Sequence, residues 1–459
     1  MQAHGESLNL FTDELINKAI TQAQYVDHLP ISQSDNGFLE FNLTSNNFID
    51  LSRSRLYLKC KVVMKDNESI GKTVRKYPPA EAKDGETDEQ QRIRLDLVDL
   101  EKRDVVPTNA LLGGIFQKVD LTIQQRNISN DVQTYTYPYK YMVDTLINST
   151  QDIDMGKLFV KDDTQTIDGA SFFSTAESFE ILEYMEKAKK IPQTFLTRAQ
   201  VINKSREFEM QGPIALDFFQ QNRLLLHNVN LGLKFYQSSP QFSLLSGQGD
   251  KSKFKIKILE ARLRLCHINL DPAVTVAISD TLKLKPAQYP FTASKLHTYS
   301  IPKGSTNSVI TDVFSSQCPD KLFVFMVDSV KAAGSFEENP YAFEHFNLSE
   351  IGFYVDNISL PSKPLKLDFG DTPSESNYIE AWQRIRELNP NSIISYEDFH
   401  KGYTIFCFDL GNYKDLPVNN FGSTKLELRF KSPLEKTVTV FTYGQFRSCL
   451  SIDAARNVR

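Results

Sequence analysis

The chain has 459 residues, a formal net charge of −5, and hydrophobic and charged fractions of 41% and 24%. This length suggests two to four domains, and the composition is typical of a folded globular protein rather than a disordered one. The mildly acidic balance argues against a dedicated nucleic-acid binder, which would carry a basic face. No run approaches 18 apolar residues, so we expect no membrane-spanning helix.

The five cysteines are odd in number and widely spaced: Cys60, Cys266, Cys318, Cys407 and Cys449. Residues 1–10 lack the basic segment and apolar run of a secretory signal. We therefore expect reduced cysteines in a protein that is made inside a cell. The 32 Phe and 18 Tyr, against one Trp, favour strands, whose half-buried faces accept flat rings.

At the N-terminus, residues 6–25 read as an amphipathic helix, in which Leu10, Leu15, Ala19 and Ile20 share a face. We take residues 1–30 as an N-terminal helical arm. Two interpretations stay open for it. The helix packs on its own domain, or it reaches a neighbouring subunit.

Strand patterns dominate the chain beyond this arm. Apolar and charged residues alternate along 56–62 and again along 254–265, which is typical of antiparallel sheets with one face buried. In the second of these segments the alternation slips by one residue at Leu259. We expect a β-bulge there, because otherwise the following apolar residues would point to the wrong face.

Two segments interrupt the strand pattern. Residues 65–104 are half charged, with both signs mixed and Pro78-Pro79 within them, and are predicted to be an exposed insertion. Residues 156–200 are predicted to be a second insertion. Its part from 178 to 190 has early acidic residues and late lysines, which favours a helix.

The two halves of the chain share an order of features. Five segments of the first half face five of the second: 56–62 with 322–327, 119–120 with 355–356, 137–148 with 377–388, 212–218 with 402–408, and 229–235 with 424–430. The offset between the halves falls by 30 and then by 50 residues where the two insertions lie. A duplicated unit with two added loops explains this order.

Each half is predicted to hold about eight strands and one helix in its middle connection. The predicted fold is therefore all-β with a few helices: a double jelly roll of two tandem eight-stranded antiparallel β-sandwiches. The expected domains are the arm at 1–30, a first jelly roll at 31–272, a linker at 273–289, a second jelly roll at 290–452 and a tail at 453–459. The linker region should be helical over 272–284, between Pro272 and Pro286.

Motifs that carry chemistry are missing from the sequence. Residues 70–73, Ile-Gly-Lys-Thr, resemble the end of a phosphate loop, but Asp66 stands where its first glycine belongs. Cys266 and His267 are adjacent on a predicted strand and should point to opposite faces, as a buried Cys beside a surface His. We expect no catalytic residues, no metal site and no cofactor, and the protein is not predicted to be an enzyme.

The second half resembles the double-jelly-roll major capsid proteins of Polinton (Maverick) elements and adintovirus-like elements. The segments that carry the resemblance are PAQYP at 286–290, HTYSIP at 297–302, NPYAFEHFN at 339–347, YVD at 354–356, LPSKP at 360–364, GYTIFCFDL at 402–410 and SIDAARNV at 451–458. In the first half the match is looser, over 51–62, 117–123, 135–141 and 212–235. The charged insertion has no counterpart.

The resemblance implies a structural protein of double-stranded DNA viruses. Such a protein self-assembles as a homotrimer, a pseudo-hexameric tile that builds an icosahedral shell. Its partners would be further copies of itself and a penton or minor capsid protein, without sequence-specific nucleic-acid binding, and it would reside in the virion after assembly inside the host cell. Two alternatives are a tandem β-sandwich binding module, lectin-like or receptor-binding, without a lattice, and a carbohydrate hydrolase on a β-sandwich.

The two middle helices carry the candidate intersubunit contacts. These residues are Tyr137, Tyr139, Tyr141, Tyr378 and Trp382. Two interpretations stay open: the rings cap each sandwich, or they lie between subunits. In the second case, substitution of Trp382 by Ala would impair trimer assembly more than monomer folding.

Overall fold

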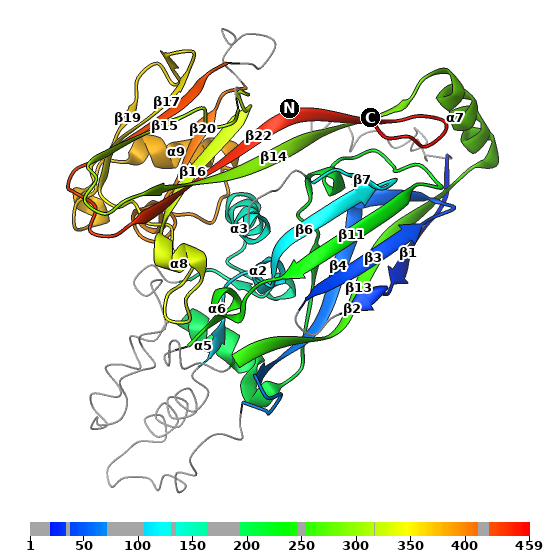
Figure 1. Ribbon diagram of the computed structural model, residues 1–459, viewed down its shortest axis with the longest axis horizontal. Helices are drawn as coiled ribbons and strands as arrows, with labels where there is room; N and C mark the ends of the chain where they lie inside the picture. Colours follow the sequence, from blue (N-terminus) through cyan, green and yellow to red (C-terminus); the bar gives the residue numbers. More distant parts are fainter. Residues whose placement is uncertain are drawn as a thin grey trace, which may run out of the picture.

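Two sandwiches of antiparallel strands lie side by side along the long axis of the molecule (Figure 1). The computed structural model describes residues 19–33, 37–70, 105–129, 135–162, 193–246, 254–315, 317–411 and 422–459. Because one face of each sheet packs on its partner sheet, apolar and polar residues alternate along strands such as β4 (Phe48–Met64), as the sequence predicts.

The first sandwich has two main sheets. One has the order β1-β13-β4-β10, and the other has the order β2-β3-β11-β6-β7. The remaining strands are β1 (Ile20–His28), β2 (Ser32–Gln33), β3 (Phe38–Thr44), β6 (Phe116–Ile123), β7 (Arg126–Asn127), β10 (Phe208–Pro213), β11 (Asn230–Gln237) and β13 (Phe254–Leu270). Short pairs β5 (Val106–Pro107) with β12 (Leu244–Leu245), and β8 (Ile153–Asp154) with β9 (Phe159–Val160), lie outside these sheets.

The second sandwich repeats this arrangement. Its sheets have the orders β14-β22-β16-β20 and β15-β21-β17-β18, and β19 also pairs with β17. The strands are β14 (Ala287–Ile301), β15 (Asn307–Thr311), β16 (Lys321–Asp328), β17 (Leu348–Val355), β18 (Ile358–Ser359), β19 (Leu365–Lys366), β20 (Ile405–Asp409), β21 (Thr424–Phe430) and β22 (Val438–Ile452).

The predicted repeat is confirmed by strand position. β4 and β16 hold the same place in their sheets, as do β13 and β22, β10 and β20, β11 and β21, and β6 and β17. In each half, a helix falls between the second and third of these strands in chain order, between β6 and β10 in the first half and between β17 and β20 in the second. Each half is therefore a jelly roll with four equivalent strands in each sheet.

The slip at Leu259 is a β-bulge, as predicted. The register between β13 and β4 shifts between Ile258 and Glu260, so Leu259 is the extra residue. Beyond the bulge, Ala261, Leu263 and Leu265 return to the buried face.

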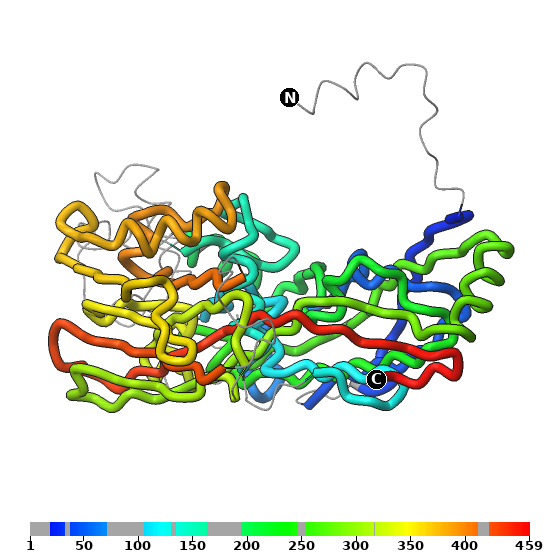
Figure 2. Tube along the Cα trace, turned by 90° about the horizontal axis from the view of Figure 1, so that it is seen from above, coloured from blue at the N-terminus to red at the C-terminus, as the bar shows by residue number. Residues whose placement is uncertain are grey.

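Helices occupy the connections between strands. They are α2 (Leu111–Gly114), α3 (Thr136–Asn148), α5 (Gln193–Val201), α6 (Pro240–Ser243), α7 (Pro272–Leu284), α8 (Ser329–Ala333), α9 (Ile379–Leu388) and α10 (Tyr396–His400). α7 confirms the predicted helix over 272–284: Asp271 caps it by accepting from the Ala273 amide at 2.8 Å, and Pro272 stands in its first turn. β14 and β22 extend from the second jelly roll across the first (Figure 2).

The prediction of a helix over 6–25 is wrong for its C-terminal part. Residues from Ile20 onward form β1, which pairs with β13 from Leu270 to Leu263. The free edge of β13 offers these residues a ladder of backbone hydrogen bonds, and this pairing outweighs the local helical pattern. Residues 6–18, most of the charged insertion and the predicted helix at 178–190 lie outside the described residues.

The bulge can be tested by two single-residue deletions. Deletion of Leu259 removes the extra residue and leaves the alternation intact, so we expect a folded protein. Deletion of Arg262 turns Leu263 and Leu265 toward water, at a cost of about 3–6 kcal/mol in lost burial. Thermal unfolding followed by circular dichroism measures both; equal melting temperatures would contradict the bulge assignment.

Candidate assembly site

α3 of the first jelly roll docks on the outer face of the second. The Tyr139 side chain is fully buried and reaches rings on both sides of the junction. Its ring centroid lies 4.2 Å from that of Phe441 on β22, 5.9 Å from Phe325 on β16 and 5.8 Å from Phe242. The Tyr139 hydroxyl donates to the Pro340 carbonyl at 3.1 Å. Tyr139 therefore joins the two halves of one chain.

The other two tyrosines of α3 belong to the first jelly roll. Tyr137 accepts from the Ala215 amide at 3.3 Å. The ring of Tyr141 lies directly over Gly113, where an added Cβ would stand 2.2 Å from the ring's Cγ atom. Position 113 therefore has to be glycine for α3 to approach α2 this closely.

The second middle helix carries a separate aromatic stack. Tyr378, just before α9, stacks on Tyr396 at 4.3 Å and on Phe369 at 5.1 Å, and its hydroxyl donates to the Tyr396 carbonyl. Trp382 is half-buried; its Nε1–H donates to the Ile394 carbonyl at 3.1 Å. These contacts hold the loop after α9 against the second jelly roll.

The predicted contact residues thus have different surroundings. Tyr137, Tyr139, Tyr141 and Tyr378 are at most 3% exposed within a single chain, which leaves their side chains no surface to offer a neighbour. The capping interpretation fits three of them, whereas Tyr139 joins the jelly rolls, which neither interpretation foresaw. A contact between subunits through Trp382 stays a prediction.

A polar seam runs beside the aromatic junction. Lys140 on α3 forms an ion pair with Asp217, and Asp217 accepts from the amide and the hydroxyl of Ser294 on β14 at 2.6 and 2.7 Å. Asp144 accepts from the Tyr443 hydroxyl at 3.1 Å. Burial raises the pKa of Asp144 to about 6, although the charge of Lys140 opposes this shift.

The buried residue Asp162, which is ion-paired within the first half, joins the halves at a second place. Arg198 on α5 donates to Asp162 at 2.6 Å, and both side chains are inaccessible to solvent. Asp162 also accepts from Asn109 of the first jelly roll and from Asn339 of the second, and its amide donates to the Tyr403 hydroxyl at 2.8 Å. Burial raises the pKa of Asp162, against the opposing charge of Arg198. If Arg198 and Asp162 separated, each would be an unpaired charge away from water, which is costly. The pair therefore favours this one arrangement.

The prediction of a surface His at 267 is wrong. His267 is 7% exposed; its Nδ1 lies 3.1 Å from the Ser45 hydroxyl and its Nε2 lies 3.2 Å from Nε2 of His28. His28 belongs to β1, where the sequence predicted a helix instead of a strand. This strand covers His267. Cys266 is buried, as predicted.

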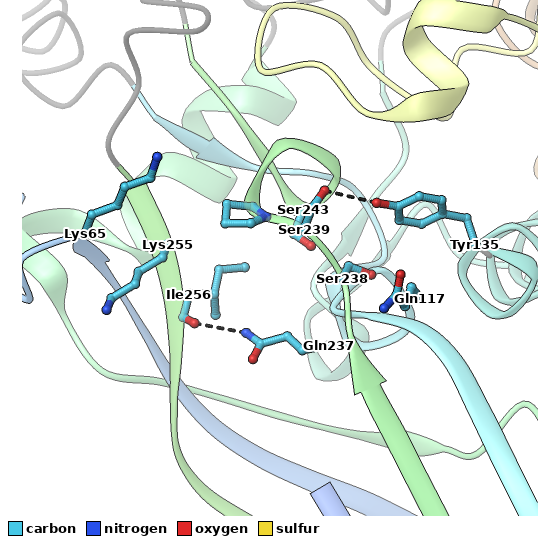
Figure 3. Close-up of a pocket in the computed structure, with 10 residues that line it drawn as sticks. Lys65, Gln117, Tyr135, Gln237, Ser238, Ser239, Ser243, Lys255 and Ile256 are labelled. Carbon is cyan, nitrogen blue, oxygen red and sulfur yellow. Dashed lines mark hydrogen bonds between the residues drawn. The ribbon is translucent and has the colours of Figure 1, made fainter. Parts of the chain in front are cut away.

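The described residues offer little reactive chemistry. A cavity of about 560 Å³ opens at one end of the first jelly roll, where Lys65 and Lys255 point apart and Tyr135 and Ser239 bond to each other (Figure 3). Within the described ranges, no three His, Cys, Asp or Glu side chains are grouped so that they could hold a metal ion. None of the helices described has the length and apolarity to cross a membrane.

Several solved structures of viral proteins share this fold. A chain of the Sputnik virophage superposes with a TM-score of 0.58 and 11% identity, covering 100% of this chain and 92% of that one. The Faustovirus major capsid protein superposes with a TM-score of 0.51 and 8% identity, covering 98% of this chain and 94% of that one. The PBCV-1 virus capsid superposes with a TM-score of 0.50 and 10% identity, covering 97% of this chain and 98% of that one. The fold is a double jelly roll.

Sequence comparison reaches less far. An uncharacterized protein of Caenorhabditis elegans is 24% identical over 255 residues, which span 53% of this chain and 61% of that protein. The chain thus matches less than two thirds of this relative's length. No protein-family model matches the chain.

Substitution of Tyr139 tests the junction. Tyr139→Ala leaves a cavity among five rings, and we expect a loss of about 3–5 kcal/mol in the free energy of unfolding. Tyr139→Phe removes only the hydrogen bond to Pro340 and should cost about 0.5–1.5 kcal/mol. Denaturant unfolding measures both; a Tyr139→Ala protein as stable as the wild type would contradict the role of the ring.

The polar seam predicts a pH dependence. Because the pKa of Asp144 is raised on folding, the folded chain binds more protons between pH 4 and 6, and the contribution of Asp144 to stability falls as pH rises through this window. Asp144→Asn keeps an acceptor for Tyr443 without the charge. The difference between the melting temperature of this variant and that of the wild type, measured at the same pH, should therefore rise in favour of the variant from pH 4 to pH 7. A constant difference would contradict the assignment.

Proposed function

We propose that the protein is a major capsid protein that assembles into an icosahedral viral shell. The observation that carries this proposal is the double-jelly-roll fold, which matches chains of viral capsids over nearly the whole length of both partners. Two rigid sandwiches locked by a buried aromatic junction suit a shell protein, because tiles of a lattice must keep a fixed shape.

The finer assignments form part of the same proposal. The family is that of Polinton or adintovirus-like elements, the assembly unit is a homotrimer, and a penton or minor capsid protein completes the shell. The protein functions as structure rather than as an enzyme, in the virion, after assembly inside the host cell. The net charge of −5 is compatible with a shell that encloses DNA without condensing it.

Light scattering and electron microscopy of the purified protein test the proposal. We expect a trimer of three 52.3-kDa chains, about 157 kDa in total, and shells or flat arrays at high concentration. A stable monomer that forms no arrays would contradict it. That outcome would favour the alternative of a tandem β-sandwich binding module without a lattice.

A further inference from the structure

The junction inside the chain shows what the equivalent surface of the first jelly roll could bind. In the second jelly roll, Phe323 pairs with Tyr443 and Phe325 pairs with Phe441 on the face that α3 covers. In the first, Tyr57 pairs with Arg262 and Lys59 pairs with Glu260 at the equivalent positions of β4 and β13. The offset of 266 residues that relates β4 to β16 gives the same correspondence.

This face of the first jelly roll has no such cover among the described residues. Tyr57, Lys59, Lys61 and Arg262 are all half-buried, and they alternate with fully buried core residues such as Leu58 and Cys60, so they lie on the outer side of the sheet. Arg262 pairs with Glu260 at 2.5 Å on this same face. Where the second jelly roll presents aromatic rings to α3, the first therefore presents charges and one tyrosine.

The helix α9 is the counterpart of α3. The offset of 240 residues places Ile379 at the position of Tyr139 and Glu380 at that of Lys140. Ile379 is 57% exposed, whereas Tyr139 is fully buried. The exposed side chains of α9 recur at Ile379, Gln383 and Glu387, which is the four-residue spacing of one helix face. α9 therefore presents the face with which α3 docks, and nothing among the described residues covers that face.

We propose that α9 of one copy docks on the outer face of β4 and β13 of a second copy, in the way that α3 docks on β16 and β22 within the chain. This proposal rests on the proposed capsid function and names the surfaces that its trimer would use. The proposed contact between copies is charged, whereas the junction inside the chain is aromatic. The contact between copies is therefore the one that salt weakens and that can form reversibly.

Charge complementarity supports the pairing. The exposed acids of α9 are Glu380 and Glu387, while β4 presents Lys59 and Lys61 on the facing sheet. The side chain of Glu380 is 67% exposed and forms a surface pair with Arg384, which exchanges at little cost. Opposite charges that meet across an interface steer association and fix its register.

The two surfaces also lie on different jelly rolls, α9 on the second and the β4–β13 sheet on the first (Figure 1). A contact between them is heterologous, because each copy offers a different surface to each neighbour. Such a contact closes into a ring when its rotation allows. Three copies would give six jelly rolls that meet at alternating aromatic and charged junctions.

A charge-reversal experiment on the full chain tests this pairing. We expect the double substitution Glu380→Lys and Glu387→Lys to weaken trimer association about tenfold at low salt, as measured by sedimentation equilibrium. The matched control, Glu337→Lys with Glu435→Lys, changes net charge equally at exposed acids elsewhere in the second jelly roll and should associate like the wild type. Raising the salt concentration should weaken wild-type association.

The reciprocal pair Lys59→Glu and Lys61→Glu reaches the same contact from the other surface, so the test does not depend on one variant folding. Combining all four substitutions should restore association. If the wild type forms trimers and the α9 variant forms them equally well, the surface assignment is overturned while the capsid proposal stands. If the wild type itself neither trimerises nor forms arrays, the capsid proposal fails.

Discussion

The burial of Tyr139 between the two jelly rolls is the contact on which the shape of the molecule depends. The buried apolar side chains of the two sandwiches form one continuous cluster, and Tyr139 lies where the two sandwiches meet within it. A ring that contacts both Phe441 and Phe242 converts two sandwiches into one rigid body. The ion pair of Asp162 with Arg198 helps to fix the orientation of the two sandwiches, because a buried charge is stable only with its partners in one arrangement.

The two halves are duplicates, yet the outer face of β16 and β22 differs strongly in character from the equivalent face of β4 and β13. The reason is what covers each face. The outer face of β16 and β22 is aromatic because α3 of the same chain always covers it, and a permanent contact can be fully dry. The equivalent face of β4 and β13 must stay soluble in an isolated chain. It therefore carries charged side chains such as Lys59 and Lys61 between its buried residues.

Much of the fold was predictable from local patterns. Alternation located β4 and β13, the slip at Leu259 located the bulge, and Pro272 and Pro286 bounded the linker helix. The order of five segment pairs predicted two equivalent sandwiches. The strand β1 was missed, because its pairing depends on the free edge of β13, which lies some 240 residues away. The error on His267 followed from it, since β1 covers that side chain.

The sequence by itself determined the class of the fold and its duplication, because the side-chain period of a strand is a local property that every strand displays. It also singled out the tyrosines of α3 as important. Only the tertiary structure decided what they do: Tyr137 and Tyr141 pack within one sandwich, while Tyr139, between them in the sequence, faces the other. Which neighbour a helix face contacts depends on how distant segments of the chain pack. The spacing of residues along the helix does not predict that packing.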